Sequence, residues 1–291
     1  MAAVNGALVE FRSIKIQAVT KDMLRTRVLV LIFLIPAMIG VIIAGGWILA
    51  AALLVVLELA VWEYWSIFTK GGYTPSKLIL MGGMLVLIVS YNLAGHTGRT
   101  AAVTFLVMLA MIVYIISYEA GGEKPATNLG ITIGGIFCIG WLGTFLLPLR
   151  NLPNGLWWTL MVIPSAMLAD TGGYIFGKWI GRHKLCPRLS PNKTWEGFFG
   201  GILFGVPLTV LIAWILHLSI TEITLARGLI MGLVMAIFPI FGDLGVSMIK
   251  RQFGLKDTSN IIPGHGGVLD RFDTTFWAVP IGFYLITYLW L

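Results

Sequence analysis

The stretch FFGGILFGVPLTVLIAWILH, residues 198–217, contains no aspartate, glutamate, lysine or arginine. A helix of about 20 apolar residues is long enough to cross the ~30 Å hydrocarbon core of a bilayer. Runs of this kind recur along the chain, in which 58% of the 291 residues are hydrophobic, 11% are charged, and the mean hydropathy is +0.91. Water-soluble globular domains do not have such a composition. The sequence therefore predicts an integral membrane protein.

The apolar runs predict an all-α, polytopic fold with about nine transmembrane helices. Their expected ranges are 28–44, 47–68, 78–95, 100–117, 127–149, 156–171, 198–217, 226–246 and 274–291. The first two are separated only by Gly45 and Gly46, which form either a tight hairpin or a break in one long helix. Gly197, Gly201 and Gly205 lie four residues apart, a spacing that lets a second helix approach closely.

The distribution of charge predicts the orientation of these helices. A basic segment, 1–27, precedes transmembrane helices in 28–150 and a second transmembrane region in 151–291, where polar residues gather at the ends of spans and where we expect the chemistry. With the N-terminus inside, all lysines and arginines except Arg99, Arg150 and Arg227 fall in the inner segments 1–27, 69–77, 118–126, 172–197 and 247–273. Positively charged loops stay in the cytoplasm. We therefore expect a multi-pass protein of the inner (plasma) membrane, with its N-terminus and both long polar loops, 172–197 and 247–273, on the cytoplasmic side.

The net charge of +7 has two interpretations. In the first, the positive charge only reflects the topology of the protein in the membrane. In the second, the lysines and arginines clustered in the two long loops also bind an anionic substrate or lipid headgroup. No basic domain stands outside the membrane, so we expect no nucleic-acid partner. Cys138 lies in a predicted span and Cys186 in an inner loop, which gives neither a disulfide framework nor a zinc–thiolate spacing.

The last inner loop carries the densest group of polar residues, FGDLGVSMIKRQFGLKDTSNIIPGHGGVLDRFD, residues 241–273. If its first part is helical, Asp243, Ser247 and Lys250 share one face and Arg251 lies beside them. Asp270 and Asp273 are three residues apart at the start of the last span, so they project in the same direction.

Paired carboxylates in a place of low dielectric constant need neutralising charge. Either Arg271 and Lys250 supply it or a divalent metal does. Oxygen ligands without cysteine or paired histidine favour Mg²⁺ or Mn²⁺ over zinc. If Asp243, Asp270 and Asp273 converge on one pocket, they would suit one or two metal ions as ligands.

Three glycines in this loop predict an anion-binding backbone. Gly264, Gly266 and Gly267 allow amide groups to turn towards phosphate oxygens. His265 between them has two interpretations: it donates to a phosphate or transfers a proton, or it is a loop histidine bonded to a backbone carbonyl.

The other long loop lies in DTGGYIFGKWIGRHKLCPRLSPNKTWEGFFGG, residues 170–201. Ser190, Lys193 and Glu196 are candidate substrate-binding residues. Ser190 and Asn192 equally suit capping of the following helix, and Lys193 equally suits an interfacial cation. Taken together, the two loops offer carboxylates for a metal, glycines for phosphate, and cations at one membrane face, which favours phosphoryl-group chemistry. Glu58 and Glu63, inside an early span, are not assigned to this site.

On these residues the sequence resembles the phosphatidate cytidylyltransferase (CDP-diacylglycerol synthase) family of the bacterial type. The family signature is matched at every specified polar, glycine and proline position: Ser247, Lys250, Arg251, Lys256, Asp257, Ser259, Pro263, His265, Gly266, Gly267, Asp270, Arg271 and Asp273. SPNKTWEGFFGG and DTGGYIFG resemble two further family stretches, with Gly173 where the family more often has alanine. Before residue 150 the resemblance rests only on hydropathy and the number of spans.

The resemblance implies a Mg²⁺-dependent, dimeric membrane enzyme that transfers CMP from CTP to phosphatidic acid, giving CDP-diacylglycerol and pyrophosphate. It assigns Lys193, Lys250 and Arg251 to phosphate neutralisation, and Ser247 and His265 to orientation. Gly264, Gly266, Gly267 and Arg271 would contact substrate. An ether-linked lipid phosphate of archaeal type stays open as the acceptor.

Two other functions compete with this one. A CTP-dependent lipid kinase related to dolichol kinase would pass on the γ-phosphate instead. A cation or phosphate transporter would use carboxylates near the bilayer midplane, whereas those of this chain cluster at the inner ends of spans. CDP-alcohol phosphatidyltransferases are excluded, because their motif needs an Asp-Gly pair and this chain has none.

Overall fold

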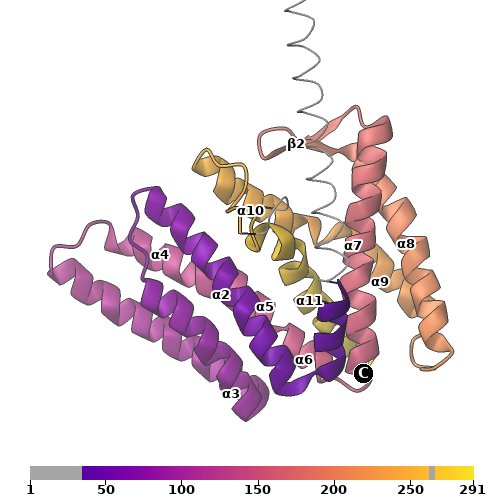
Figure 1. Cartoon of the computed structure of the whole chain (residues 1–291), viewed down its shortest axis with the longest axis horizontal. Helices are drawn as coiled ribbons and strands as arrows, with labels where there is room; N and C mark the ends of the chain where they lie inside the picture. Colours follow the sequence, from indigo (N-terminus) through magenta and orange to yellow (C-terminus); the bar gives the residue numbers. More distant parts are fainter. Residues whose placement is uncertain (1–34, 262–265) are drawn as a thin grey trace, which may run out of the picture.

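A computed structural model of the chain describes residues 35–261 and 266–291. Within them the protein is built from helices and one small hairpin of two strands (Figure 1). In chain order these elements are a helix Ile35–Ala44, α2 Gly46–Lys70, α3 Lys77–Glu119, α4 Pro125–Gly135, the π-helix η1 Ile136–Trp141, α5 Leu142–Thr144, α6 Leu146–Arg150, α7 Gly155–Ile180, β1 Lys184–Cys186, β2 Ser190–Thr194, α8 Trp195–His217, α9 Leu225–Ile237, α10 Ile240–Gln252 and α11 Leu269–Leu289.

The prediction of an all-α membrane protein is confirmed. In the described part of the chain, 6 helical segments are long and apolar enough to cross a membrane: Gly46–Lys70, Lys77–Glu119, Pro125–Arg150, Gly155–Ile180, Trp195–His217 and Leu225–Gln252. The segment Ile35–Ala44 is apolar but shorter. α11 has 21 residues, with Asp270 in its first turn, and is not among the six. The number of nine spans stays a prediction.

α3 is two antiparallel arms joined by a sharp turn. Ala94 and Gly95 have non-helical backbone angles, and Gly95 has φ +59°, which favours glycine. In a straight helix Gly83 and Leu106 would be about 35 Å apart, yet a Cβ built on Gly83 would lie 3.3 Å from Leu106 Cδ1. The two arms therefore correspond to the expected spans 78–95 and 100–117.

The first two apolar runs are separate helices. One ends at Ala44 and the next begins at Gly46, with φ +63° at Gly45 between them. Arg150 donates from Nε to the carbonyl of Ile42 at 2.7 Å and from Nη2 to that of Ile43 at 3.0 Å. A cation thus satisfies the last carbonyls of the first helix, which resolves the alternative left open at Gly45-Gly46.

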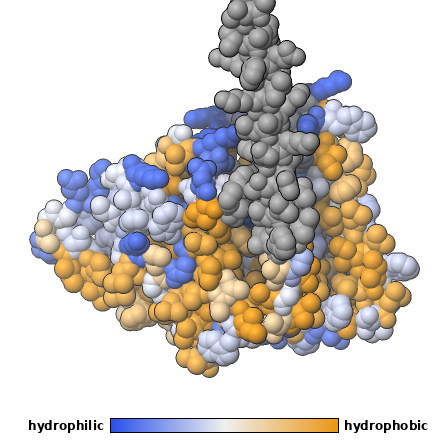
Figure 2. Space-filling view, in the orientation of Figure 1, coloured by the Kyte–Doolittle hydropathy of each residue, from blue (hydrophilic) through white to orange (hydrophobic). Residues whose placement is uncertain are grey.

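Loops predicted to share a membrane face contact one another. At one end Arg251 donates to the carbonyl of Leu189 at 3.1 Å, and the rings of Tyr73 and Phe253 lie 6.2 Å apart. At the other end Arg150 donates to the carbonyl of Ile42, beside the break at Gly45, and Asn154 donates to Glu222 at 3.0 Å. Figure 2 shows hydrophilic residues gathered at the end that carries hairpin β1–β2, with hydrophobic residues covering much of the surface below it. Which end faces the cytoplasm stays a prediction.

The core lies between the N-terminal helices and α11. Leu57 of α2, Leu80 of α3, Trp158 of α7 and Ile286 of α11 have no exposed surface. Around them the lipid-facing surface is also hydrophobic, as a membrane protein requires.

α7 and α8 pack with their backbones almost in contact. A Cβ built on Gly197 would lie 2.7 Å from the carbonyl oxygen of Gly173, and one built on Gly201 would lie 2.7 Å from that of Ala169. A Cβ on Gly205 would also meet the Ala169 backbone. The expected close helix contact along Gly197, Gly201 and Gly205 is confirmed.

Two local expectations were wrong. The span expected to end at residue 171 continues as α7 to Ile180, because hydropathy marks the edge of the apolar layer and not the end of the hydrogen-bonded helix. The polar segment after it is not a simple loop, since Lys184 pairs with Thr194 and Cys186 with Ser190 in antiparallel hairpin β1–β2. The longer α7 and the hairpin therefore place the polar residues of this region in ordered structure at the end of the helix bundle.

Candidate active site

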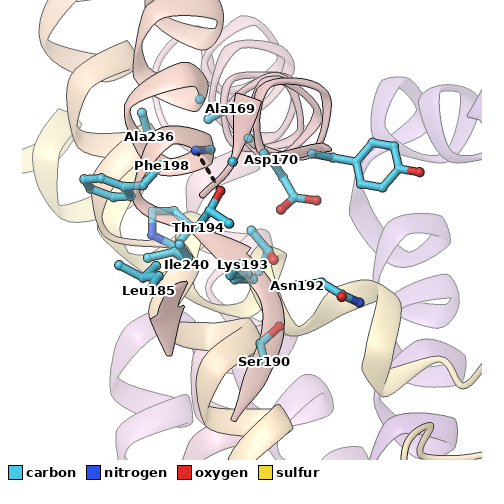
Figure 3. A pocket seen from close by; sticks show the side chains of 18 of the residues that line it. Ala169, Asp170, Leu185, Ser190, Asn192, Lys193, Thr194, Phe198, Ala236 and Ile240 are labelled. Carbon is cyan, nitrogen blue, oxygen red and sulfur yellow. Dashed lines mark hydrogen bonds between the residues drawn. The ribbon is translucent and has the colours of Figure 1, made fainter. Parts of the chain in front are cut away.

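A cavity of about 540 Å³ opens between α7, hairpin β1–β2, α8 and the α9–α10 junction (Figure 3). One part of its wall is apolar, from Ala166, Ala169, Phe198, Met235, Ala236, Pro239 and Ile240. The other part is polar and basic, from Asp170, Lys178, Lys184, Ser190, Asn192, Lys193 and Thr194. A cavity with these two parts suits an amphiphile with an anionic head.

The hairpin brings Ser190, Asn192 and Lys193 to this cavity. Figure 3 shows all three on the strand β2, opposite Asp170 of α7. The alternative that Ser190 or Asn192 caps the next helix is wrong: the cap is Thr194, whose Oγ1 accepts from the Gly197 amide at 3.1 Å. Ser190 and Asn192 line the cavity instead of capping α8.

Glu196, in the first turn of α8, holds the start of the hairpin by hydrogen bonds. Its carboxylate accepts from the amides of Arg182 at 3.0 Å and His183 at 3.1 Å, and it also pairs with the His183 ring. These contacts fix the turn between α7 and β1. Glu196 thus positions the hairpin, and its predicted binding of substrate stays a prediction.

Lys193 forms an ion pair with Asp243 of α10. Its Nζ lies 2.6 Å from Asp243 Oδ2, and Ser247 donates to the other oxygen, Oδ1, at 3.2 Å. The predicted shared face of Asp243 and Ser247 is confirmed, because α10 is helical over Ile240–Gln252. This pair joins the two polar loops at the rim of the cavity.

Lys250 and Asp270 form a second, more buried ion pair. Lys250 Nζ lies 2.6 Å from Asp270 Oδ1, and their side chains are 9% and 7% exposed. Asp270 Oδ2 accepts from the Thr258 amide at 2.8 Å, the Thr258 hydroxyl at 2.9 Å and the Gly267 amide at 3.2 Å. Lys250, one of the two cations predicted to neutralise the carboxylates, pairs with Asp270, and a part for a divalent metal stays a prediction.

The glycines of the signature loop are partly described. Gly266 has φ +82°, a left-handed conformation that favours glycine. Gly267 is glycine for another reason: a Cβ there would collide with the Thr258 hydroxyl and with both carboxylate oxygens of Glu63. Gly264 and His265 lie outside the described residues.

Glu63 is the residue that sequence reasoning missed. It lies on α2 with no exposed surface. Its carboxylate accepts from the amides of Val268 at 2.9 Å and Leu269 at 2.8 Å, and from the hydroxyls of Thr258 and Ser259. The available signal was a carboxylate inside an apolar span.

The two arginines have different surroundings. Arg251 is exposed and donates to the carbonyls of Leu189 at 3.1 Å and Leu255 at 2.9 Å, so it ties the hairpin turn to the end of α10. Arg271 follows Asp270 at the start of α11 and interacts electrostatically with Asp170 of the cavity wall.

The predicted triad of metal ligands does not form one cluster. Among residues 35–261 and 266–291, no group of three or more carboxylate, histidine or cysteine side chains is placed to hold a metal ion. Asp273 is 6% exposed and accepts from the Thr274 amide at 2.6 Å. Asp243 interacts electrostatically with both Asp273 and Asp170. Two neighbouring carboxylates suffice for Mg²⁺ when substrate phosphates complete its coordination, so the prediction of Mg²⁺ remains, with Asp270 committed to Lys250.

The chain is similar to enzymes of one family over nearly its whole length. The model of the cytidylyltransferase family matches residues 25–289. A phosphatidate cytidylyltransferase of Synechocystis sp. is 31% identical over 291 residues, covering 88% of this chain and 96% of that relative. The enzyme of the same name from Pseudomonas aeruginosa is 32% identical over 272 residues, covering 89% and 95%. One from Staphylococcus epidermidis is 46% identical over 130 residues, 44% of this chain and 48% of the relative.

Proposed function

Because this chain belongs to the cytidylyltransferase family and is therefore a nucleotidyltransferase, we propose that it transfers CMP from CTP to phosphatidate. The products are CDP-diacylglycerol for phospholipid synthesis and pyrophosphate. The observation that carries this proposal is the cavity at the Lys193–Asp243 pair, whose apolar wall suits acyl chains and whose basic wall suits phosphate. Two phosphatidate cytidylyltransferases cover this chain almost end to end, which supports the choice of substrates.

The reaction needs positioning and charge neutralisation more than a strong base. A phosphatidate phosphate oxygen, already anionic, forms a bond to the α-phosphorus of CTP. The bond from that phosphorus to the oxygen bridging it to the β-phosphorus breaks, and pyrophosphate leaves. No proton has to be removed from the nucleophile. The chain's residues must hold two anionic substrates together, which costs electrostatic energy unless cations surround them.

Lys193 is the leading candidate for that neutralisation. It borders the cavity, and its present partner Asp243 is another polar group of the same site. Lys250, Arg251 and Arg271 add positive charge at the same end of the molecule. Ser190 and Asn192 line the cavity and would orient phosphate oxygens by hydrogen bonds. Ser247 orients Asp243, and His265 keeps its predicted role in orienting substrate.

We propose Mg²⁺ as the cofactor, with a second cation possible in the same charge environment. Asp243 and Asp273, with Asp170 nearby, are the carboxylates that fit it. When bound, the ion would neutralise triphosphate charge and stabilise the leaving pyrophosphate. The fit rests on oxygen donors alone, which is the ligand chemistry that Mg²⁺ prefers.

The topology belongs to the same proposal. We propose nine spans, with the N-terminus and the hairpin end in the cytoplasm of a cell whose inner membrane holds the enzyme, because the positive charge concentrates there. A homodimer is the proposed assembly. Fusing a reporter that fluoresces only in the cytoplasm to residue 291 tests the topology: nine spans leave that end outside and the reporter dark.

The function is tested with purified protein, CTP labelled at the α-phosphorus, phosphatidate and Mg²⁺. We expect label in the extracted lipid, and its loss when EDTA is added. A lipid kinase would leave the lipid unlabelled and release labelled CDP into water. That second result, obtained with an isoprenoid alcohol as acceptor, would replace cytidylyl transfer by phosphoryl transfer.

A further inference from the structure

We propose that Glu63 of α2 is a positioning residue that holds the catalytic signature loop against the start of α11. The inference rests on the proposed function, since it concerns the loop that carries Asp270. It assigns a part in the reaction to the N-terminal half of the chain, where no catalytic motif lies. The contacts join residues 195 to 206 positions apart in the sequence.

Among the described residues, four donors surround the Glu63 carboxylate. Two are consecutive amides, Val268 and Leu269, at the first turn of α11, at 2.9 and 2.8 Å. Two are hydroxyls, Thr258 at 2.8 Å and Ser259, at the other end of the loop. One carboxylate therefore joins both ends of the segment that surrounds 262–265.

Charge explains why a carboxylate fills this position. A helix start carries partial positive charge and amides without intrahelical partners. An anion is stabilised there, as a bound phosphate is at other helix starts. Glu63 has no exposed surface, so these donors take the place that water would have around its carboxylate.

The hydroxyl of Thr258 links Glu63 to the second carboxylate of the loop. It lies 2.8 Å from Glu63 Oε2 and 2.9 Å from Asp270 Oδ2, although it has one hydrogen to donate. Asp270 in turn binds Lys250 of α10 at 2.6 Å. A continuous chain of polar contacts thus runs from α2 through the loop to α10, which fixes the loop relative to both halves of the protein.

This arrangement changes the meaning of the loop's glycines. The amide of Gly267 donates to Asp270, and the next two amides donate to Glu63. In the described part of the loop, the amides after Gly266 are therefore occupied by the protein's own carboxylates. Gly267 has no Cβ because the Glu63 carboxylate packs against its Cα. We call this hydrogen-bonded arrangement of Glu63, Thr258, Ser259 and residues 266–270 the brace. Substrate phosphates would then bind at the cavity beside hairpin β1–β2.

Glu63→Gln is the decisive variant, with Glu63→Asp as the conservative partner and Glu58→Gln as the matched control. Gln cannot accept from two amides and two hydroxyls at once, because half of its head group is a donor. We expect kcat for CDP-lipid formation to fall about 100-fold, while KM for phosphatidate stays within about twofold. Asp retains the charge and should restore part of kcat. Glu58 lies on the same helix and makes no contact with the loop among those described.

Hydrogen exchange provides the readout that does not depend on activity. Amides of a peptide covering 266–272 should exchange faster in Glu63→Gln than in wild type, whereas those of the hairpin, 184–194, should not change. Faster exchange confined to the loop, together with the fall in kcat, supports the proposal. Wild-type kcat in Glu63→Gln, or faster exchange spread evenly over both peptides, overturns it. If the wild type forms no CDP-lipid, the proposed function fails, and the exchange experiment still decides whether Glu63 holds the loop.

Discussion

The two polar loops of this protein contain the same kinds of residue and do different work. In the described parts of the signature segment, 258–261 and 266–270, backbone amides and hydroxyls are bound by Glu63 and Asp270. Hairpin β1–β2 is open, and Ser190, Asn192 and Lys193 of its second strand border a cavity of about 540 Å³. Glycines, lysines and carboxylates thus form a rigid brace in one loop and a binding surface in the other. The difference lies in burial: Glu63 has no exposed surface, whereas Lys193 and its partner Asp243 are partly exposed beside the cavity.

The closed loop should show the largest effect of a single substitution. Asp270→Asn removes the counter-charge of Lys250, whose side chain is 9% exposed. Leaving one member of a buried ion pair alone costs about 3–5 kcal/mol. We expect lipid labelling below about 1% of wild type, with insertion into the membrane unchanged.

Glu119→Gln is the control for Asp270→Asn, because it removes an exposed carboxylate from the same membrane end. Near-normal turnover in Asp270→Asn would show that the brace is dispensable. Recovery of the variant by high Mg²⁺ would point instead to Asp270 as a metal ligand.

The open hairpin should show a smaller effect that depends on substrate. Lys193→Met keeps the aliphatic stem and removes the charge beside Asp243, where both side chains are partly exposed, 19% and 27%. Loss of one charged contact costs about 1.5–3 kcal/mol, so kcat/KM for phosphatidate should fall about tenfold to 100-fold. Steady-state rates over a phosphatidate series measure it. Lys70→Ala, an exposed lysine at the end of α2, should match wild type; equal losses in both variants would remove Lys193 from the site.

Substitutions at the α7–α8 contact should change thermal stability, by an amount that depends on which glycine is replaced. Gly201→Ala would place a Cβ 2.7 Å from the Ala169 carbonyl, whereas Gly173→Ala would place one 3.4 Å from that of Gly197. Overpacking typically costs about 1–3 kcal/mol, so the first variant should unfold at a clearly lower temperature in detergent. The second should stay close to wild type in stability and turnover. Equal destabilisation by both would mean that the helices can separate to admit a methyl group.

The smallest effect is expected at the cap that joins the hairpin to α8. Thr194→Ala removes the acceptor for the Gly197 amide, a change that costs about 1 kcal/mol at a helix start. Thr194→Ser keeps the oxygen and should behave like wild type. Thermal unfolding of the three proteins side by side checks this, and a Ser variant as unstable as Ala would assign the effect to the methyl group.

The sequence was most informative where contacts are local. The spacing of Asp243 and Ser247 predicted a shared helix face, and the four-residue repeat of glycines predicted the α7–α8 contact. These features need only the geometry of one helix. The membrane class followed from hydropathy, since six described segments are long and apolar enough to span.

Contacts between distant segments were not predictable in the same way. Nothing in SPNKT alternates between apolar and polar residues as a strand does, and its pairing with Lys184 depends on α7 and α8 lying close together. Glu63 was visible as a carboxylate in an apolar run, but its donors are 195 to 206 residues away. The predicted grouping of Asp243, Asp270 and Asp273 is not found among the described residues, because Asp270 pairs with Lys250, and that choice of partner depends on three-dimensional proximity. Binding of Mg²⁺ stays a prediction.

The distance in sequence between Glu63 and Leu269 determines when, during synthesis of the chain, their hydrogen bond can form. The two residues are 206 positions apart, and a ribosome adding about 5–20 residues per second needs roughly 10–40 s to make that length. During this interval α2 is already available to the membrane, while the amides that will bind its glutamate do not yet exist. A chain halted before residue 268 therefore cannot assemble the brace at all. On the proposed role of Glu63, a nascent chain therefore gains activity only after residues 268 and 269 have been made.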